Sequence, residues 1–296
     1  MSNTLFTKAE DFIWKNARLL ERRLFAYHFK EGAREDVITA LCAYQNADGG
    51  FGQAFEPDIR CPDSQPVPVQ HALEVLDTVG IQTDEDAEMV ERICDYLMTI
   101  TTKEGGVPWL LPSALNYPRA PWWQTEDNPP ASLNPTAAIA GLLHKNQIDH
   151  PWLEPATQFC WTNIETMEAR EMHEVGTVLT FLYHAPDRPR AERERHRLFE
   201  SMLSAGLVAG LDDTAYVRKP LDWASTPDNP LRKYFSQEQI EANLDVVVAG
   251  QQDDGGWTIA WAPISPCCEL EWRGVVTLAT LLTLRANGRL TTPSIP

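Results

Sequence analysis

The chain has 296 residues and is acidic: Asp and Glu outnumber Lys and Arg by 42 to 25, for a net charge of −17. This balance excludes a nucleic-acid-binding surface, which needs clustered Lys and Arg, and disfavours an anionic membrane surface. No stretch approaches the roughly 18 apolar residues of a membrane-spanning helix, and the N-terminal residues lack the apolar core of a signal segment. We therefore expect a cytoplasmic protein with one domain, residues 1–296, and a small-molecule substrate as its partner, without membrane insertion. Assembly into a homo-oligomer stays open.

An all-α fold is predicted, because apolar residues recur at helical spacing and no run alternates as a strand does. Loops rich in Pro, Gly and Asp separate the helical segments. The predicted helices, in chain order, cover residues 5–28, 34–45, 68–80, 85–101, 134–146, 152–167, 171–184, 189–206, 236–250 and 268–286, with a further short helix considered at 213–219.

Polar helices alternate with more apolar ones along the chain. This alternation predicts an α/α barrel, a toroid of about 10 to 12 helices in which outer helices face water and inner helices are enclosed. The long loops at 51–67, 107–133, 207–235 and 257–267 each lead from a polar helix to the next apolar one. We expect them to gather on one side and to form the mouth of a site, since loops of this length in compact domains are usually functional or disordered.

A seven-residue phrase occurs near both ends of the chain. Residues 45–51 read Gln-Asn-Ala-Asp-Gly-Gly-Phe, residues 251–257 read Gln-Gln-Asp-Asp-Gly-Gly-Trp, and 101–107 form a degenerate copy, Thr-Thr-Lys-Glu-Gly-Gly-Val. Such repetition indicates stacked supersecondary units. We interpret the phrase structurally: the glycines allow positive φ, the Asp accepts backbone N–H bonds, the aromatic packs between helices, and the Gln bridges to the adjacent repeat.

These phrases resemble the Gln-Trp repeats of the terpenoid cyclase and protein prenyltransferase superfamily. The phrase ending at Trp257 matches closely, and the one ending at Phe51 has Phe in place of Trp. The resemblance implies a single α/α barrel without a second domain. The chain lacks the Asp-x-Asp-Asp acid of class II cyclases and the zinc-binding Asp-x-Cys of prenyltransferases, so the resemblance implies the fold more than either activity.

Polar residues cluster at the predicted N-terminal ends of the apolar helices, which in a toroid converge on the mouth. His71 and His173 are candidate general bases or metal ligands, with Glu174, Glu271 or Glu269 as carboxylate partners. The alternative is that each His only caps or hydrogen-bonds within the helices. No spacing fixes a metal site, so no cofactor is required and a divalent metal is the minority hypothesis. The full set is Gln70, His71, Asn134, His173, Glu174, Glu271 and Arg273.

Two acidic loop segments are further candidates. Glu56 and Asp58 flank Pro57 and lie near Arg60, so they either form a salt-bridged loop or supply acid–base function. Asp212 and Asp213 either protonate an alkene or cap a helix that starts near Thr214.

Tryptophans are concentrated in the loops. They either shape a hydrophobic pocket that stabilises cations or anchor the loops by burying area. The vicinal pair Cys267 and Cys268 is interpreted as buried and inert, with metal ligation or action as a nucleophile as the alternative. The candidate substrate-binding residues are Trp122, Trp123, Asn134, Trp223, Trp261 and Trp272.

Together these patterns predict a terpenoid cyclase-like enzyme that uses acid–base chemistry on an apolar or amphipathic small molecule in the central cavity. Cyclisation, isomerisation and lyase-type elimination are all open. One alternative is an α/α-barrel carbohydrate-active enzyme, a glycoside hydrolase or lyase, since such sites use paired carboxylates with aromatic platforms. The other is a binding module without catalysis.

Overall fold

The computed structural model describes residues 2–213 and 215–290. Within these residues the protein is all-α, with twelve α-helices, and pairing of the β type is limited to two isolated bridges. The predicted fold class is thus confirmed. The chain divides into two compact units: unit 1 comprises Met1–Ala40 and Val208–Pro296, and unit 2 comprises Leu41–Leu207. No described helix is both long and apolar enough to cross a membrane.

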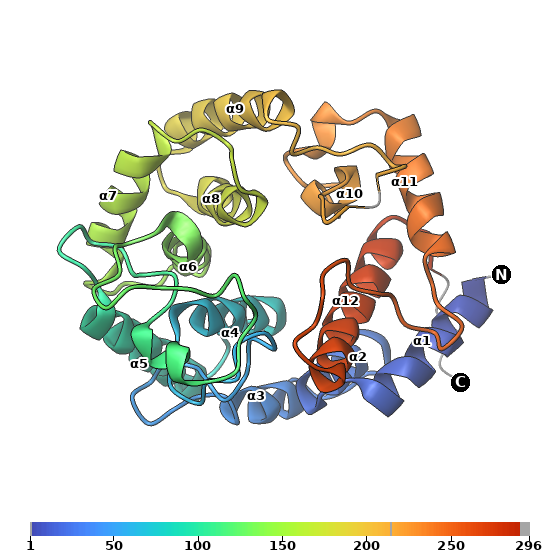
Figure 1. Cartoon of the computed structure of the whole chain (residues 1–296), viewed down its shortest axis with the longest axis horizontal. Helices are drawn as coiled ribbons and strands as arrows, with labels where there is room; N and C mark the ends of the chain where they lie inside the picture. The colour runs from blue at the N-terminus through green and yellow to red at the C-terminus, as the bar shows by residue number, and fades with distance from the viewer. Residues whose placement is uncertain (1, 214, 291–296) are drawn as a thin grey trace. The chain divides into compact units, whose positions relative to one another are not determined.

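Unit 2 consists of two layers of helices. In the inner layer, α6 lies between α4 and α8. Helices α5, α7 and α9 form the outer layer and pack against these inner helices (Figure 1). All of residues 133–143 in α6 are buried except Asn134, whereas the outer helix α9 buries five positions along one face. The predicted alternation of apolar and polar helices therefore holds in this unit. Its helices are α4 (Pro66–Val79), α5 (Asp84–Ile100), α6 (Leu133–Lys145), α7 (Leu153–Ile164), α8 (Met172–His184) and α9 (Arg188–Ser204), with a 3-10 helix, η1 (Pro112–Asn116).

The three inner helices of unit 2 run in the same direction. Near their starts, the hydroxyl of Thr177 in α8 donates to the carbonyl of Leu133 in α6 at 3.3 Å. Near their ends, Lys145 of α6 lies 2.7 Å from Asp77 of α4. Gly141 permits the close packing of α6 on α8, because a Cβ at this position would meet the α8 backbone at less than 3.0 Å. The N-terminal ends of α4, α6 and α8 therefore lie on one side of the unit.

In unit 1, α1 packs against α12 around an aromatic core. The prediction of one helix over 5–28 is wrong, because the chain leaves the helical conformation at Arg18, whose ψ is 165°. The break lets α2 fold back so that Phe25 stacks on Phe6 at 5.8 Å. The elements are α1 (Ser2–Asn16), α2 (Leu19–Phe29), most of α3 (Arg34–Cys42), α10 (Pro220–Trp223), η2 (Arg232–Tyr234), α11 (Gln237–Ala249) and α12 (Pro266–Ala286).

The short helix considered at 213–219 is also wrong for its described residues, which form turns and irregular backbone. Helix α10 begins only at Pro220, whose fixed φ suits the first turn of a helix. Thr214 lies outside the described residues. The other predicted helices agree with the structure to within three residues at each end.

All three copies of the repeated phrase form the same loop. The first glycine has a φ of +89°, +93° or +94°, a conformation that favours Gly. A Cβ there would lie closer than 3.0 Å to a backbone carbonyl of another outer helix, so the loop rests directly on that helix. The degenerate copy is therefore a true repeat. The pairs are Gly49 with Arg92 of α5, Gly105 with Pro155 of α7, and Gly255 with Lys8 of α1.

The second glycine of each phrase lies against an aromatic ring. A Cβ at this second glycine would lie 2.8 Å from an aromatic ring on the same outer helix. The ring belongs to the residue four positions after the one whose carbonyl faces the first glycine. The Asp accepts from the second glycine in two copies, as predicted, and Gln251 reaches the carbonyl of Leu5 on α1 at 2.9 Å. Helices α1, α5 and α7 thus each offer a carbonyl and an aromatic ring four residues apart. The ring pairs are Gly50 with Tyr96, Gly106 with Phe159, and Gly256 with Phe12.

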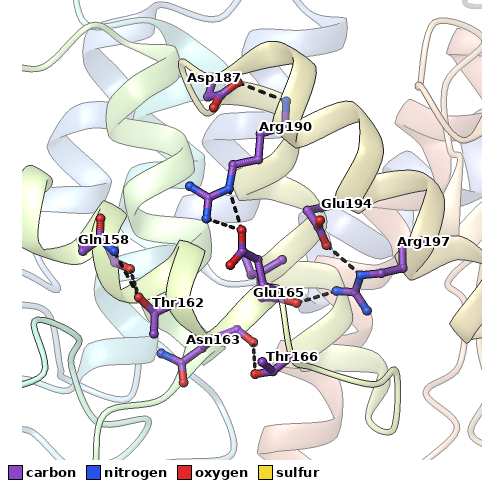
Figure 2. Close-up of polar contacts among 10 residues, drawn as sticks. Gln158, Thr162, Asn163, Glu165, Thr166, Asp187, Arg190, Glu194 and Arg197 are labelled. Carbon is purple, nitrogen blue, oxygen red and sulfur yellow. Dashed lines mark hydrogen bonds and ion pairs between the residues drawn. The ribbon is translucent and has the colours of Figure 1, made fainter.

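No such phrase follows α7, and an arginine holds the corresponding segment. Figure 2 shows the side chain of Arg197 from α9 reaching the end of α7. Its guanidinium donates to the carbonyls of Ile164 and Met167 and is itself paired with Glu194 at 2.7 Å. A side-chain fork therefore joins α7 to α9 where the glycine loop joins other outer helices.

Candidate carboxylate–histidine site

The candidate site in unit 2 begins with two long loops that pair with each other. Ile59 and Arg119 form an isolated antiparallel bridge, and the amide of Ala120 donates to the carbonyl of Asp58 at 2.9 Å. This pairing fixes the segment that carries Glu56 and Asp58, both only 3% exposed. The loops at 51–67 and 107–133 are thus associated and ordered.

Gln65 fixes these same loops to the start of α4. It is the N-cap residue of α4, and its buried side-chain amide donates to Ser113 and accepts from the amide of Leu111, both at 2.9 Å. Prolines in the first turn then start α4 without losing a backbone hydrogen bond. His71 lies one turn further along α4, facing the loop that carries Glu56.

His71 lies between two carboxylates. Its Nε2 atom is 3.0 Å from Oε2 of Glu56, and its Nδ1 atom is 3.2 Å from Oε2 of Glu74, three residues along the same helix. Gln70 donates to the other oxygen of Glu74 at 2.8 Å. The ring of Phe55 meets the His71 ring edge-on at 6.1 Å. The site thus combines a buried carboxylate, a histidine and a half-exposed carboxylate in one hydrogen-bonded chain.

The charges of this chain are coupled. Burial alone would lower the pKa of His71, but the hydrogen bonds to Glu56 and Glu74 and their negative charges outweigh it and raise the pKa from 6.5 to about 10. Burial would likewise raise the pKa of Glu74, but its bond to His71 holds that pKa below the usual value. At neutral pH His71 is therefore an imidazolium that donates from both nitrogens.

The polar residues expected at the other inner helices of unit 2 lie at the starts of α6 and α8. Asn134 has a non-helical backbone, with φ −95° and ψ 115°, and precedes a cis proline. His173 is exposed, and its backbone amide donates to the N-cap side chain of Glu171 at 2.9 Å. Burial and the nearby charge of Glu171 raise the pKa of Glu174. A role for these three residues in one site with His71 stays a prediction.

In unit 1, Arg273 holds the glycine loop. Its Nε donates to the carbonyl of Trp257 at 3.1 Å, and its guanidinium pairs with Asp254 at 2.7 Å. These contacts explain its burial and give it a structural task beside the predicted catalytic one. Glu271 accepts from the thiol of Cys267 at 3.5 Å. Convergence of Glu271 and Arg273 with the residues of unit 2 stays a prediction.

Asp212 and Asp213 lie on an exposed turn. The carboxylate of Asp213 accepts from the amide of Ala215 at 2.9 Å, an arrangement typical of turns. Exposure to water gives no reason for a carboxyl group to act as a strong acid, so the alkene-protonating role has no support from this geometry.

The predicted tryptophans occupy three different environments. Trp122 is 44% exposed, whereas Trp123 is buried and stacks on Trp109 at 4.4 Å. Trp223 is buried beneath the guanidinium of Arg218. The loop-anchoring interpretation fits Trp123 and Trp223. The remaining pair, Trp261 and Trp272, meets edge to face at 5.2 Å in unit 1.

Over the described residues, no group of three or more His, Cys, Asp or Glu side chains is arranged to hold a metal ion. The hypothesised site of two histidines and a carboxylate is therefore not formed there.

Glu74, Gln65 and Ser113 were missed by the sequence analysis. Glu74 had a usable signal, because side chains three residues apart share one helix face and His71 with Glu74 has this spacing. Gln65 and Ser113 are 48 positions apart and meet only through the packing of two loops. No local pattern identifies such a pair.

Comparison with known proteins gives the fold alone. No protein-family model matches the chain, and no curated protein matches it. Among solved structures, the chain is similar to the crystal structure of a protein from Actinoplanes, with a TM-score of 0.51 and 16% sequence identity. The match covers 94% of this chain and 89% of that chain. This likeness supports the helical fold and says nothing of activity.

Proposed function

We propose that the protein is an enzyme, similar in architecture to terpenoid cyclases, that performs acid–base chemistry on an apolar or amphipathic small molecule. The observation that carries the proposal is the chain from buried Glu56 through His71 to half-exposed Glu74. Burying charged groups costs free energy, and perturbed pKa values gather at functional sites more often than elsewhere.

The centre favours removal of a proton from the substrate over protonation of it. Glu56 is a buried carboxylate held in place by the imidazolium of His71, so it is the group of this centre placed to accept a proton from a substrate. Cyclisation started by a strong acid needs the opposite arrangement, a protonated carboxyl group in an apolar pocket. Isomerisation and lyase-type elimination are therefore the reactions that this geometry supports best.

The centre can complete such a reaction with one carboxylate. When Glu56 takes up a proton from one carbon of the substrate, it loses its negative charge, and the imidazolium of His71 stays between Glu56 and Glu74. For an isomerisation, Glu56 returns this proton to another carbon of the substrate. For an elimination, it passes the proton to the leaving group.

Deuterium incorporation tests proton abstraction even when the substrate is an unidentified compound in a mixture. The purified protein is incubated in D2O with a small-molecule extract of its host, and all masses are compared with those from Glu56→Gln, His71→Gln and a control. Glu104→Gln serves as the matched control, because Glu104 is an exposed residue in the glycine loop at 101–107 of the same unit. We expect at least one compound to gain deuterium or to disappear with the native protein and the control only.

Equal conversion by Glu56→Gln and the native protein would remove this centre from the mechanism. Conversion restricted to oligosaccharides would favour the carbohydrate-active alternative. A ligand retained in native mass spectrometry, with no conversion by any form of the protein, would favour the binding module.

A further inference from the structure

Arg119 holds its own loop in unit 2 together through one guanidinium. Its Nε atom donates to the carbonyl of Trp123 at 2.7 Å, and one terminal nitrogen donates to the carbonyl of Leu115 at 2.9 Å. The same nitrogen lies 3.4 Å from the carbonyl of Tyr117, and the other donates to the side chain of Gln124 at 3.3 Å. These four acceptors are uncharged, so the rigid fork of the guanidinium sets the path of the loop.

The backbone of Arg119 pairs with the loop that carries Glu56. Arg119 forms an isolated antiparallel bridge with Ile59. Beside this bridge, the amide of Arg60 donates to the carbonyl of Pro118 at 2.9 Å. The amide of Ile59 in turn donates to the carbonyl of Glu56 at 3.0 Å and so closes the turn that carries this carboxylate. A contiguous series of contacts therefore leads from the guanidinium to a carboxylate of the candidate site.

The contact of Glu56 with His71 depends on this pairing of loops, because Glu56 does not lie on α4. His71 and Glu74 are three residues apart on that helix, so helical geometry brings them together. Glu56 instead reaches His71 from a loop, and its Oε2 atom lies 3.0 Å from the Nε2 atom of the ring. Hydrogen bonds of this type span about 2.7–3.2 Å, so even a small movement of the loop weakens the contact.

We propose that Arg119 is a positioning residue of the carboxylate–histidine site: its guanidinium fixes the loop that holds Glu56 against His71. This role deepens the proposed function and rests on the same site. Arg119 acts through Glu56 and performs no chemical step of its own. Its loss should therefore change the charge state of His71, which keeps its proton through the hydrogen bonds to Glu56 and Glu74. Arg119→Lys keeps the positive charge but lacks the fork, so it should release the loop.

NMR titration of the His71 ring in the full-length protein tests this role, and the His71→Gln variant identifies the signal. We expect Arg119→Lys to weaken proton binding by His71 at least about tenfold, seen as a fall of its pKa from about 10 toward 6.5. Arg197→Lys is the matched control. It also removes a guanidinium that holds backbone carbonyls in unit 2, but it does so at the end of α7, so it should leave the pKa of His71 unchanged.

A milder variant, Gln124→Ala, keeps the test available if Arg119→Lys does not fold. It removes one acceptor of the guanidinium at an exposed side chain and should weaken proton binding by His71 about twofold. An unchanged pKa of His71 in every folded variant at these two positions, or an equal fall in Arg197→Lys, would overturn the role of Arg119. Failure of the proposed reaction gives a different result: the deuterium experiment would show no conversion, while the pKa of His71 would still depend on Arg119.

Discussion

The Nε2 atom of His71 lies 3.0 Å from a carboxylate oxygen of Glu56, whose side chain is only 4% exposed. A buried carboxylate therefore has a cationic partner, and that partner is anchored from its other side by Glu74.

His71 should make the stability of the protein depend on alkaline pH. Its pKa is about 10 in the folded protein against 6.5 for an ordinary histidine, so the folded state binds the proton more tightly. The resulting stabilisation is fully present below about pH 6.5 and is lost as the pH rises through about 10. His71→Gln should lower the free energy of unfolding by about 1.5–3 kcal/mol at pH 6.5, the usual range for hydrogen bonds to charged groups.

Urea unfolding at a series of pH values from 6 to 10.5 measures the difference in free energy of unfolding between the native protein and His71→Gln. This difference should shrink steadily toward the alkaline end. His173→Gln, at a side chain 46% exposed, is the control and should follow the native profile. A difference that stayed constant over the whole range would contradict the assigned charge of His71.

The two carboxylates should contribute unequally to the pKa of His71. Glu56 is buried and Glu74 is half exposed, so solvent screens the Glu74 charge more strongly. Glu56→Gln should therefore lower the pKa of His71 more than Glu74→Gln does. NMR titration of the His71 ring measures both shifts; a native His71 that titrates near 6.5 would show that the ion-paired chain does not form in solution.

Alanine in the glycine loops should be costly for a steric reason. At Gly105 a Cβ would meet the carbonyl of Pro155, and the backbone has a φ of +93°. Strain and overpacking together predict that Gly105→Ala lowers the free energy of unfolding by about 2–5 kcal/mol. Gly206→Ala, also in unit 2, is the control: its φ is +69° but nothing lies within 4 Å, so only the strain applies. Equal losses in both variants, measured by urea unfolding, would mean that the loop does not rest on α7.

Local patterns were enough to predict the helices and the repeated loops. The helical spacing of apolar residues located most of the helices. Inner and outer helices could be told apart because they bury different fractions of their surface. The phrase at 101–107 lacks both the Gln and the Asp, yet Gly105 adopts the same positive φ as Gly49 and Gly255. The two glycines therefore carry the loop, and the other positions of the phrase strengthen it.

Features that depend on contacts distant in sequence were not predictable in the same way. The break at Arg18 contains no Pro or Gly, and it accompanies the stacking of Phe25 on Phe6, a contact that no local pattern signals. In the site, His71 and Glu56 were each named as candidates, but their pairing depends on a loop fixed by Ile59 and Arg119. A single sequence shows which residues carry chemistry, whereas their meeting depends on how two loops associate.

Arg197 should stabilise unit 2 through its geometry as well as its charge. Its guanidinium donates to the carbonyls of Ile164 and Met167 at the end of α7 and pairs with Glu194 (Figure 2). A lysine has the charge but lacks the planar fork, so it cannot make these bonds together. Arg197→Lys should therefore lower the free energy of unfolding by about 1–3 kcal/mol, nearly as much as Arg197→Met.

Thermal and urea unfolding measure the two Arg197 losses against Arg170→Met. The Arg170 side chain is 80% exposed and, within the part of the chain that the structure describes, pairs with exposed Glu168, so its removal should leave stability unchanged. If Arg197→Lys were as stable as the native protein, charge alone would explain the contact. The carbonyls at the end of α7 would then not depend on the planar guanidinium.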